Sequence, residues 1–328
     1  MKLRFASAIL VLVTALSPYV CAQKTLPAPK WPSGESLFYR VNLRINRDIK
    51  TKSALSLPQT PTDADLDVQG ILQVAPIPSG KPANAGAIRL RTWFLALVSD
   101  ISILPRGAKP GEGKTQRVPA DDKFVDCTLE PSGEIDEVTG LDALAPEQQQ
   151  AWREWATRFA FPFILQKEHR KRGDKWTGEE PEAIPSPIAD LRWQEKSHYV
   201  RDEPCAALQF ARSGNFQRTA NSEPCAVILT TSSLLQKSSP QDATPPDYKQ
   251  RGLRTRGTAR GSNEIILYIS RKSGQLVRAT QHASQQMDVL IALADGSTQV
   301  QYDVAAKANS SVELLIDLPL ILQPNPRK

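Results

Sequence analysis

Apolar and polar residues alternate along most of this chain, a pattern typical of strands with one buried face. In residues 35–46 one face is apolar throughout: Leu37, Tyr39, Val41, Leu43 and Ile45. Residues 66–74 and 276–293 alternate in the same way. The segment 276–293 is longer than an ordinary strand, so we expect a bulge or bend within it. Successive hairpin patterns favour antiparallel pairing.

Shorter apolar segments extend the predicted sheet. We expect a pair of buried strands within 87–104 and a hairpin from 124–129 and 135–138 around the turn Pro131–Gly133. Further strands are predicted at 175–176, 191–200, 265–270, 298–304 and 312–322. The polar, proline-containing segments 50–63 and 236–249 predict connections.

One segment, 146–162, has the periodicity of an amphipathic helix instead. Its apolar residues recur about every 3.6 positions: Trp152, Trp155, Ala156, Phe159 and Phe163. Pro146 suits the first helical turn, and Pro162 is expected to end or kink the helix. The aromatic stripe is interpreted first as core packing. A ligand platform of Trp152, Trp155 and Phe159 is the alternative.

These patterns predict a mainly β fold, with an antiparallel curved sheet (a half-barrel or a sandwich) and one central amphipathic helix. We expect residues 35–328 to form a single β-rich domain. The alternative is two β halves that meet at the helix 146–162.

The N-terminus has the pattern of a secretory signal peptide at 1–22, with basic Lys2 and Arg4 before an apolar stretch. Residues 23–34 read as an extended lead-in. Export to the periplasm or the extracellular space is therefore predicted. A lipid anchor on Cys21 is disfavoured, because Val20 stands where a small residue is expected. No later stretch is apolar for the roughly 20 residues that a transmembrane helix needs.

Three cysteines follow the predicted cleavage point. Cys205 and Cys225 each lie in a Glu-Pro-Cys-Ala tetrapeptide that opens an apolar run. If those runs are neighbouring strands, a Cys205–Cys225 disulfide is expected in an oxidising compartment. Cys127 is then interpreted as a buried thiol and not as a nucleophile.

The chain lacks the common catalytic motifs: nucleophile elbow, metalloprotease helix, paired cysteines and P-loop. The histidines His169, His198 and His282 are widely spaced, so neither a metal nor another cofactor is predicted. Acidic clusters occur at 121–122, 134–137 and 179–182. We interpret them as solvated turns and strand edges, although paired carboxylates can catalyse glycoside hydrolysis.

The chain carries a net charge of +6. The basic segment 249–260 contains Arg251, Arg254, Arg256 and Arg260 without an acidic residue. Arginine-rich, glycine-spaced loops suit anionic partners. Because export is predicted, we expect the partners of this segment to be anionic envelope surfaces and not nucleic acid. The alternative interpretation is a solvated loop or a charged edge strand that prevents aggregation.

Several short motifs follow one another from the turn at 130–133 onward. They include Gly140-Leu141, Trp152, Phe161-Pro162 and Gly173-Asp174-Lys175-Trp176, and later the stretch 257–277. In this order the chain resembles a group of exported bacterial β-rich proteins of unknown function. The resemblance spans roughly 124–304 and implies no catalytic residues. A curved sheet with a helix against it also looks like the lipoprotein-carrier half-barrels of the bacterial envelope.

Three functional hypotheses follow. The first is an exported, non-catalytic cell-envelope protein that binds an apolar or amphipathic ligand between sheet and helix. The second is a structural or interaction protein that contacts anionic envelope surfaces through the basic loop 249–260. The third is a hydrolase that uses carboxylates assembled by folding.

Overall fold

The computed structural model describes residues 25–27, 29–31, 35–53, 62–78, 86–105, 114–117, 123–182, 186–211, 215–296 and 299–316. The predicted signal peptide 1–22 lies outside the described residues. The predicted lead-in 23–34 is described only at 25–27 and 29–31.

The described strands form one antiparallel sheet of 12 strands. They are β1 (Leu37–Ser53), β2 (Thr62–Pro76), β3 (Ile88–Pro105), β4 (Lys114–Arg117), β5 (Phe124–Leu129), β6 (Ile135–Thr139), β7 (Lys175–Pro181), β8 (Leu191–Phe210), β9 (Phe216–Gln236), β10 (Leu253–Ser270), β11 (Leu276–Leu293) and β12 (Gln299–Leu314). Their order is β6-β5-β3-β2-β1-β12-β11-β10-β9-β8-β7, with β4 paired to β3. The first and last strands, β1 and β12, pair in the middle of the sheet.

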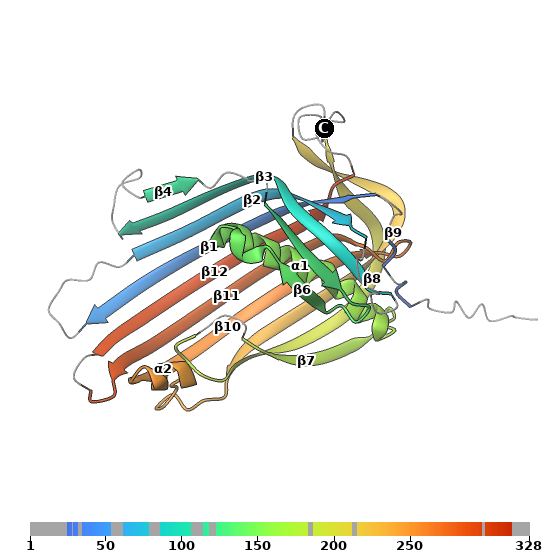
Figure 1. Ribbon diagram of the computed structural model, residues 1–328. Coiled ribbons are helices and arrows are strands. Elements are labelled where there is room, and N and C mark those ends of the chain that lie inside the picture. Colours follow the sequence, from blue (N-terminus) through green and yellow to red (C-terminus); the bar gives the residue numbers. More distant parts are fainter. Residues whose placement is uncertain are drawn as a thin grey trace, which may run out of the picture.

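The sheet curves around the helix α1 (Pro146–Lys167), which lies across its concave face (Figure 1). A short helix, α2 (Pro246–Gln250), and a 3₁₀ turn (Leu141–Ala143) complete the described elements. The sheet is not closed. The predicted fold class, a mainly β protein with a curved antiparallel sheet and one central helix, is confirmed.

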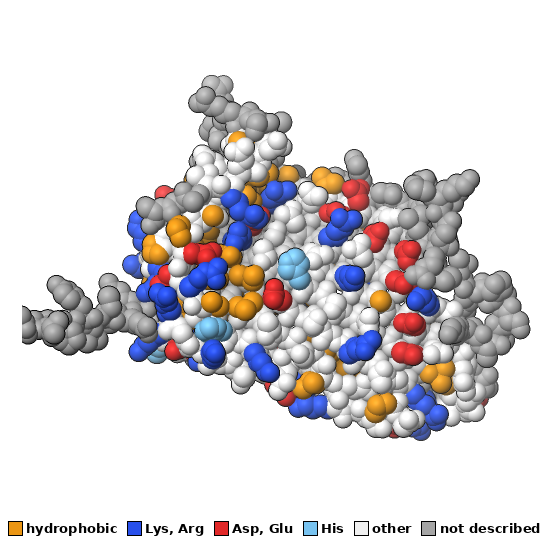
Figure 2. Space-filling view, turned by 180° about the vertical axis from the view of Figure 1, so that it is seen from behind, with side chains coloured by type: hydrophobic (Ala, Val, Ile, Leu, Met, Phe, Trp, Pro, Cys, Tyr) orange, Lys and Arg blue, Asp and Glu red, His pale blue; other side chains and the backbone are white. Residues whose placement is uncertain are grey.

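Strand alternation gives the sheet two different faces. On β1, Tyr39, Val41 and Leu43 are buried toward the helix, while Arg44 is exposed on the other side. Figure 2 shows the reverse side, where charged side chains are scattered over the surface and the main group of hydrophobic ones lies toward one end. The apolar face is therefore the concave one, and the helix covers part of it.

The aromatic stripe of α1 packs into the core. Trp155 is fully buried and stacks on Phe159 with ring centroids 4.8 Å apart, and both rings contact Tyr39 of β1. The indole Nε1 of Trp152 donates a hydrogen bond of 2.8 Å to Thr92 Oγ1 on β3. Burial of rings of this size contributes several kcal/mol each, at ~25 cal/mol per Å², which fixes the helix on the sheet.

Three expected boundaries are wrong. The helix does not stop at Pro162 but continues to Lys167. An interior proline costs about 3 kcal/mol, and burial of Phe163 and Leu165 in the following turn offsets it.

The segment 87–104 is one strand, β3, and not a pair. Leu95 is its extra residue, where the register with β2 shifts. Predicted strands 298–304 and 312–322 are one strand, β12, as far as Leu314.

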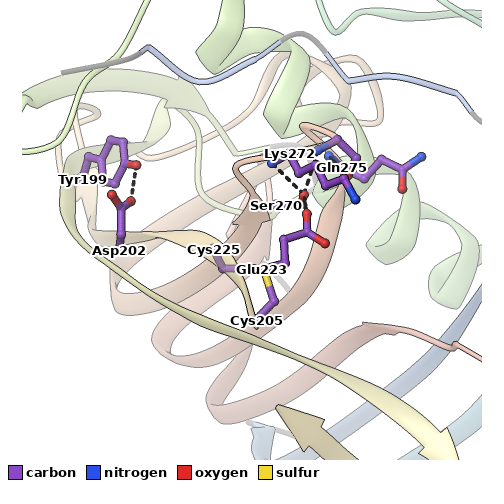
Figure 3. The surroundings of a disulfide bond; sticks show 9 residues. Tyr199, Asp202, Cys205, Glu223, Cys225, Ser270, Lys272 and Gln275 are labelled. Atoms are coloured by element: carbon purple, nitrogen blue, oxygen red, sulfur yellow. Dashed lines mark hydrogen bonds between the residues drawn. A yellow bond between two sulfur atoms is a disulfide. The ribbon is translucent and has the colours of Figure 1, made fainter. Parts of the chain in front are cut away.

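The predicted disulfide is confirmed: Cys205 and Cys225 are bonded, with Cα atoms 4.9 Å apart. It joins β8 to β9 where the register of the hairpin shifts (Figure 3). Two polar contacts lie near it. Tyr199 donates a hydrogen bond of 2.5 Å to Asp202, and Ser270 donates one to Glu223.

Candidate functional site

The three aromatic residues proposed as a ligand platform lie in the core. Trp152, Trp155 and Phe159 are each at most 4% exposed. A space of about 10 Å³ remains beside Phe159 and Trp31, no more than one water needs. The space between the aromatic stripe and the sheet is therefore filled by side chains.

An open groove lies next to α1 on the same concave face and has a volume of about 720 Å³. Strands β1, β11 and β12 provide its apolar floor: Leu43, Ile45, Ile49, Met287, Val289, Ile291, Val304, Ala306 and Ala308. These residues share a face because the strands pair in register, as Ile45 does with Ala308. The floor is the part of the concave face that one helix is too narrow to cover.

The walls of the groove are formed by different elements. Gln150 and Glu154 of α1 form one side. Trp193 of β8, Pro187 and Tyr248 of α2 form the other. A groove with an apolar floor and a few polar wall groups has the composition of small-molecule sites in proteins.

A second, smaller lobe of about 220 Å³ continues the groove across β2 and β3. Leu66, Ile101 and Pro146 line it. The two lobes share Ile45, Arg47 and Gln150, so they meet near the N-terminus of α1.

A polar network fixes the helix wall. Arg158 Nε donates to Glu154 Oε1 at 3.1 Å, and Ser310 Oγ donates to the same oxygen at 2.6 Å. Arg158 also donates to Gln281 Oε1 at 2.8 Å, and Gln281 Nε2 donates to Asn263 Oδ1 at 2.9 Å. The polar side of α1 is thus bonded directly to β12 and β11, and through Gln281 to β10, which orients its aromatic side inward.

Glu195 on β8 lies on the concave face and has a raised pKa. Burial is the main cause, and the nearby charge of Glu180 on β7 adds to it. Arg158 and Ser232 act in the opposite direction. No local sequence pattern marks Glu195, because only the register of β7 with β8 brings it to the face that carries Glu180.

The other acidic clusters are dispersed. Residues 134–137 lie at the β5–β6 hairpin, and 121–122 lie outside the described residues. Glu179 on β7 is exposed and bonded to Lys237 at 2.5 Å, and this hydrogen bond lowers the pKa of Glu179. Within the described part of the chain, no three His, Cys, Asp or Glu residues are grouped to hold a metal ion.

The predicted basic loop is largely a strand. Residues 253–260 belong to β10, because they pair with β11 from Leu253 onward. Arg254, Arg256 and Arg260 alternate with the inward-facing Thr255 and Ala259 and are exposed on the convex side. Arg251 follows α2, with its guanidinium carbon 5.7 Å from the Tyr248 ring centre. None of the four arginines lines the groove.

Cys127 on β5 is a free, buried thiol. Burial, and secondarily the charge of Asp126, raise the pKa of Cys127 to about 12. The side chain is therefore protonated at neutral pH, which disfavours a role as a nucleophile.

Comparisons with known proteins identify no family for this chain. No family model matches it, and no curated protein does. The solved structure of Pseudomonas aeruginosa OccK7 (OpdD) matches with 8% identity and a TM-score of 0.20, over 86% of this chain and 100% of that chain. OccK11 (OpdR) matches with 9% identity and a TM-score of 0.15, over 89% and 99%. Likeness at this level carries no argument about fold or function.

A search of the described helices for a membrane-spanning segment found none with the necessary length and apolar character.

Proposed function

We propose that this chain is an exported, non-catalytic cell-envelope protein that binds an apolar or amphipathic ligand in the groove beside α1. The observation that carries the proposal is the open groove of about 720 Å³ with an apolar floor. Monomeric proteins rarely leave a large contiguous apolar surface open to water without a binding role.

The site differs from the one expected between the aromatic stripe and the sheet. The aromatic residues stabilise the helix, and the helix in turn forms one wall of the groove. Its polar residues Gln150 and Glu154 line this wall. A ligand would therefore contact the polar side of α1 and the apolar floor together, which suits an amphipathic molecule.

Export is supported by the disulfide Cys205–Cys225. Disulfides persist in oxidising compartments and are rare in the cytosol.

The groove is tested by filling it. Ala306 lies on the floor, and its neighbour Ala305 lies on the opposite face of the same strand, β12. We expect Ala306→Trp to weaken binding of the apolar fluorophore N-phenyl-1-naphthylamine at least tenfold. Ala305→Trp, the matched control, should bind the fluorophore as the wild type does.

Circular dichroism and thermal unfolding establish that both variants fold. Equal fluorophore binding by wild type and Ala306→Trp would show that the groove is not the binding site.

A further inference from the structure

The floor of the larger lobe, on β1, β11 and β12, contains one charged side chain, Arg47. On β1 the inward-facing row reads Leu43, Ile45, Arg47 and Ile49, so a guanidinium interrupts an apolar row. Arg47 lies where the two lobes meet and lines both of them. Its cross-strand neighbours are small: Ala64 on β2 and Ala306 on β12.

No carboxylate in the described part of the chain forms an ion pair with Arg47. The side chain is exposed to the groove. An arginine on an apolar floor without a protein partner is a specific recognition group, because its planar donors match carboxylate and phosphate oxygens.

The carboxylates that line the two lobes belong to the walls, except for Asp65 on β2, which accepts a hydrogen bond from Asn46 at 2.6 Å. Two of the wall carboxylates have other partners. Glu154 is bonded to Arg158 and Ser310. Glu182 accepts the indole N–H of Trp193 at 3.0 Å. Glu147 lies in the first turn of α1, where a carboxylate favours the positive end of the helix dipole. Arg47 therefore provides the positive charge that faces the ligand space.

We propose that the groove ligand is a single-chain lipid with an anionic headgroup, which Arg47 binds while the acyl chain lies along the apolar floor. This inference rests on the proposed function and adds the ligand class. One chain suits a groove of about 720 Å³, within the range of roughly 300–1,000 Å³ that holds one drug-sized molecule.

The test compares dodecanoate with its uncharged methyl ester in competition with a fluorescent fatty acid. Wild-type protein should bind dodecanoate about tenfold more tightly than the ester, a difference of ~1.4 kcal/mol. In Arg47→Gln the dodecanoate affinity should fall to that of the ester, and the ester affinity should not change. Inorganic phosphate, which lacks a chain, should not compete.

The matched control is Arg44→Gln, on the same strand and exposed on the convex face. It should leave both affinities at the wild-type level. If Arg47→Gln binds dodecanoate as the wild type does, or if the wild type binds acid and ester equally, the headgroup assignment is overturned. The proposal that the groove binds an apolar ligand is not affected by either result. If the wild type binds neither compound, the headgroup assignment is overturned, and the fluorophore test on Ala306→Trp then decides separately whether the groove binds apolar ligands.

Discussion

The two tryptophans of α1 differ in their hydrogen bonding, and this difference predicts unequal effects of the same substitution. Trp152 donates to Thr92 Oγ1, and Thr92 in turn donates to the carbonyl of Val125 at 3.1 Å. Trp155 is fully buried, and its Nε1 has no hydrogen-bond acceptor among the described residues. Replacement by phenylalanine removes a similar apolar area at both positions.

The hydrogen-bonding contributions to the free energy of unfolding have opposite signs at the two positions. Trp152→Phe loses a hydrogen bond with a net value of about 0.5–1.5 kcal/mol, whereas Trp155→Phe removes a buried unpaired donor that costs about 1–3 kcal/mol. We therefore expect Trp152→Phe to lower the free energy of unfolding by about 1.5–4.5 kcal/mol more than Trp155→Phe does.

Urea titration followed by far-ultraviolet circular dichroism measures this difference, with the slopes of the transitions compared to exclude a change in the unfolded state. Equal losses for the two variants, or a larger loss for Trp155→Phe, would refute the role assigned to the Trp152–Thr92 hydrogen bond.

Two further predictions concern stability. Cys205 and Cys225 are 20 residues apart, so the double variant Cys205→Ala/Cys225→Ala should lose about 3 kcal/mol of unfolding free energy in the chain-entropy model. Reduction of the wild type by dithiothreitol should reproduce this loss in urea titrations. An unchanged urea midpoint would contradict the stabilising role of the disulfide. Arg91 forms two hydrogen bonds of 2.8 Å with Asp126 and lowers the pKa of that carboxyl from its usual 3.8. The stability from Asp126 is thus present above pH 3.8 and is lost as the pH falls through the lowered pKa. The gap in melting temperature between wild type and Asp126→Asn should be larger at pH 6 than at pH 2.5, and a gap independent of pH would contradict this pairing.

Much of the sheet could be predicted because alternation is local. The face of residues 35–46 that reads as apolar is the face that β1 buries. The hairpin around Pro131–Gly133 and the pairing of the two Glu-Pro-Cys-Ala strands also follow from short segments, and both are confirmed. The register of β1 with β12 joins the two ends of the chain, and no local pattern reports it.

The site was predicted less well, for a physical reason. An aromatic stripe shows which side of a helix is apolar, but not whether the partner surface fills the space beside it. The floor residues were visible as apolar rows, including Met287, Val289 and Ile291 in the segment 276–293. Whether a helix covers such a row depends on where the helix crosses the sheet. For 253–260 a strand was only the alternative interpretation, because Gly257 and the arginines suggested a loop, whereas pairing with β11 makes it a strand.

The proposed function requires that the groove beside α1 binds an apolar or amphipathic ligand. Native mass spectrometry of the purified protein, compared with the same protein after denaturation, shows whether the groove holds such a ligand. We expect an added mass of one lipid-sized molecule in the wild type, which is absent from Ala306→Trp and retained by Ala305→Trp. A wild-type protein that carries no such mass, and acquires none on incubation with dodecanoate, would show that the groove does not bind a ligand of this class.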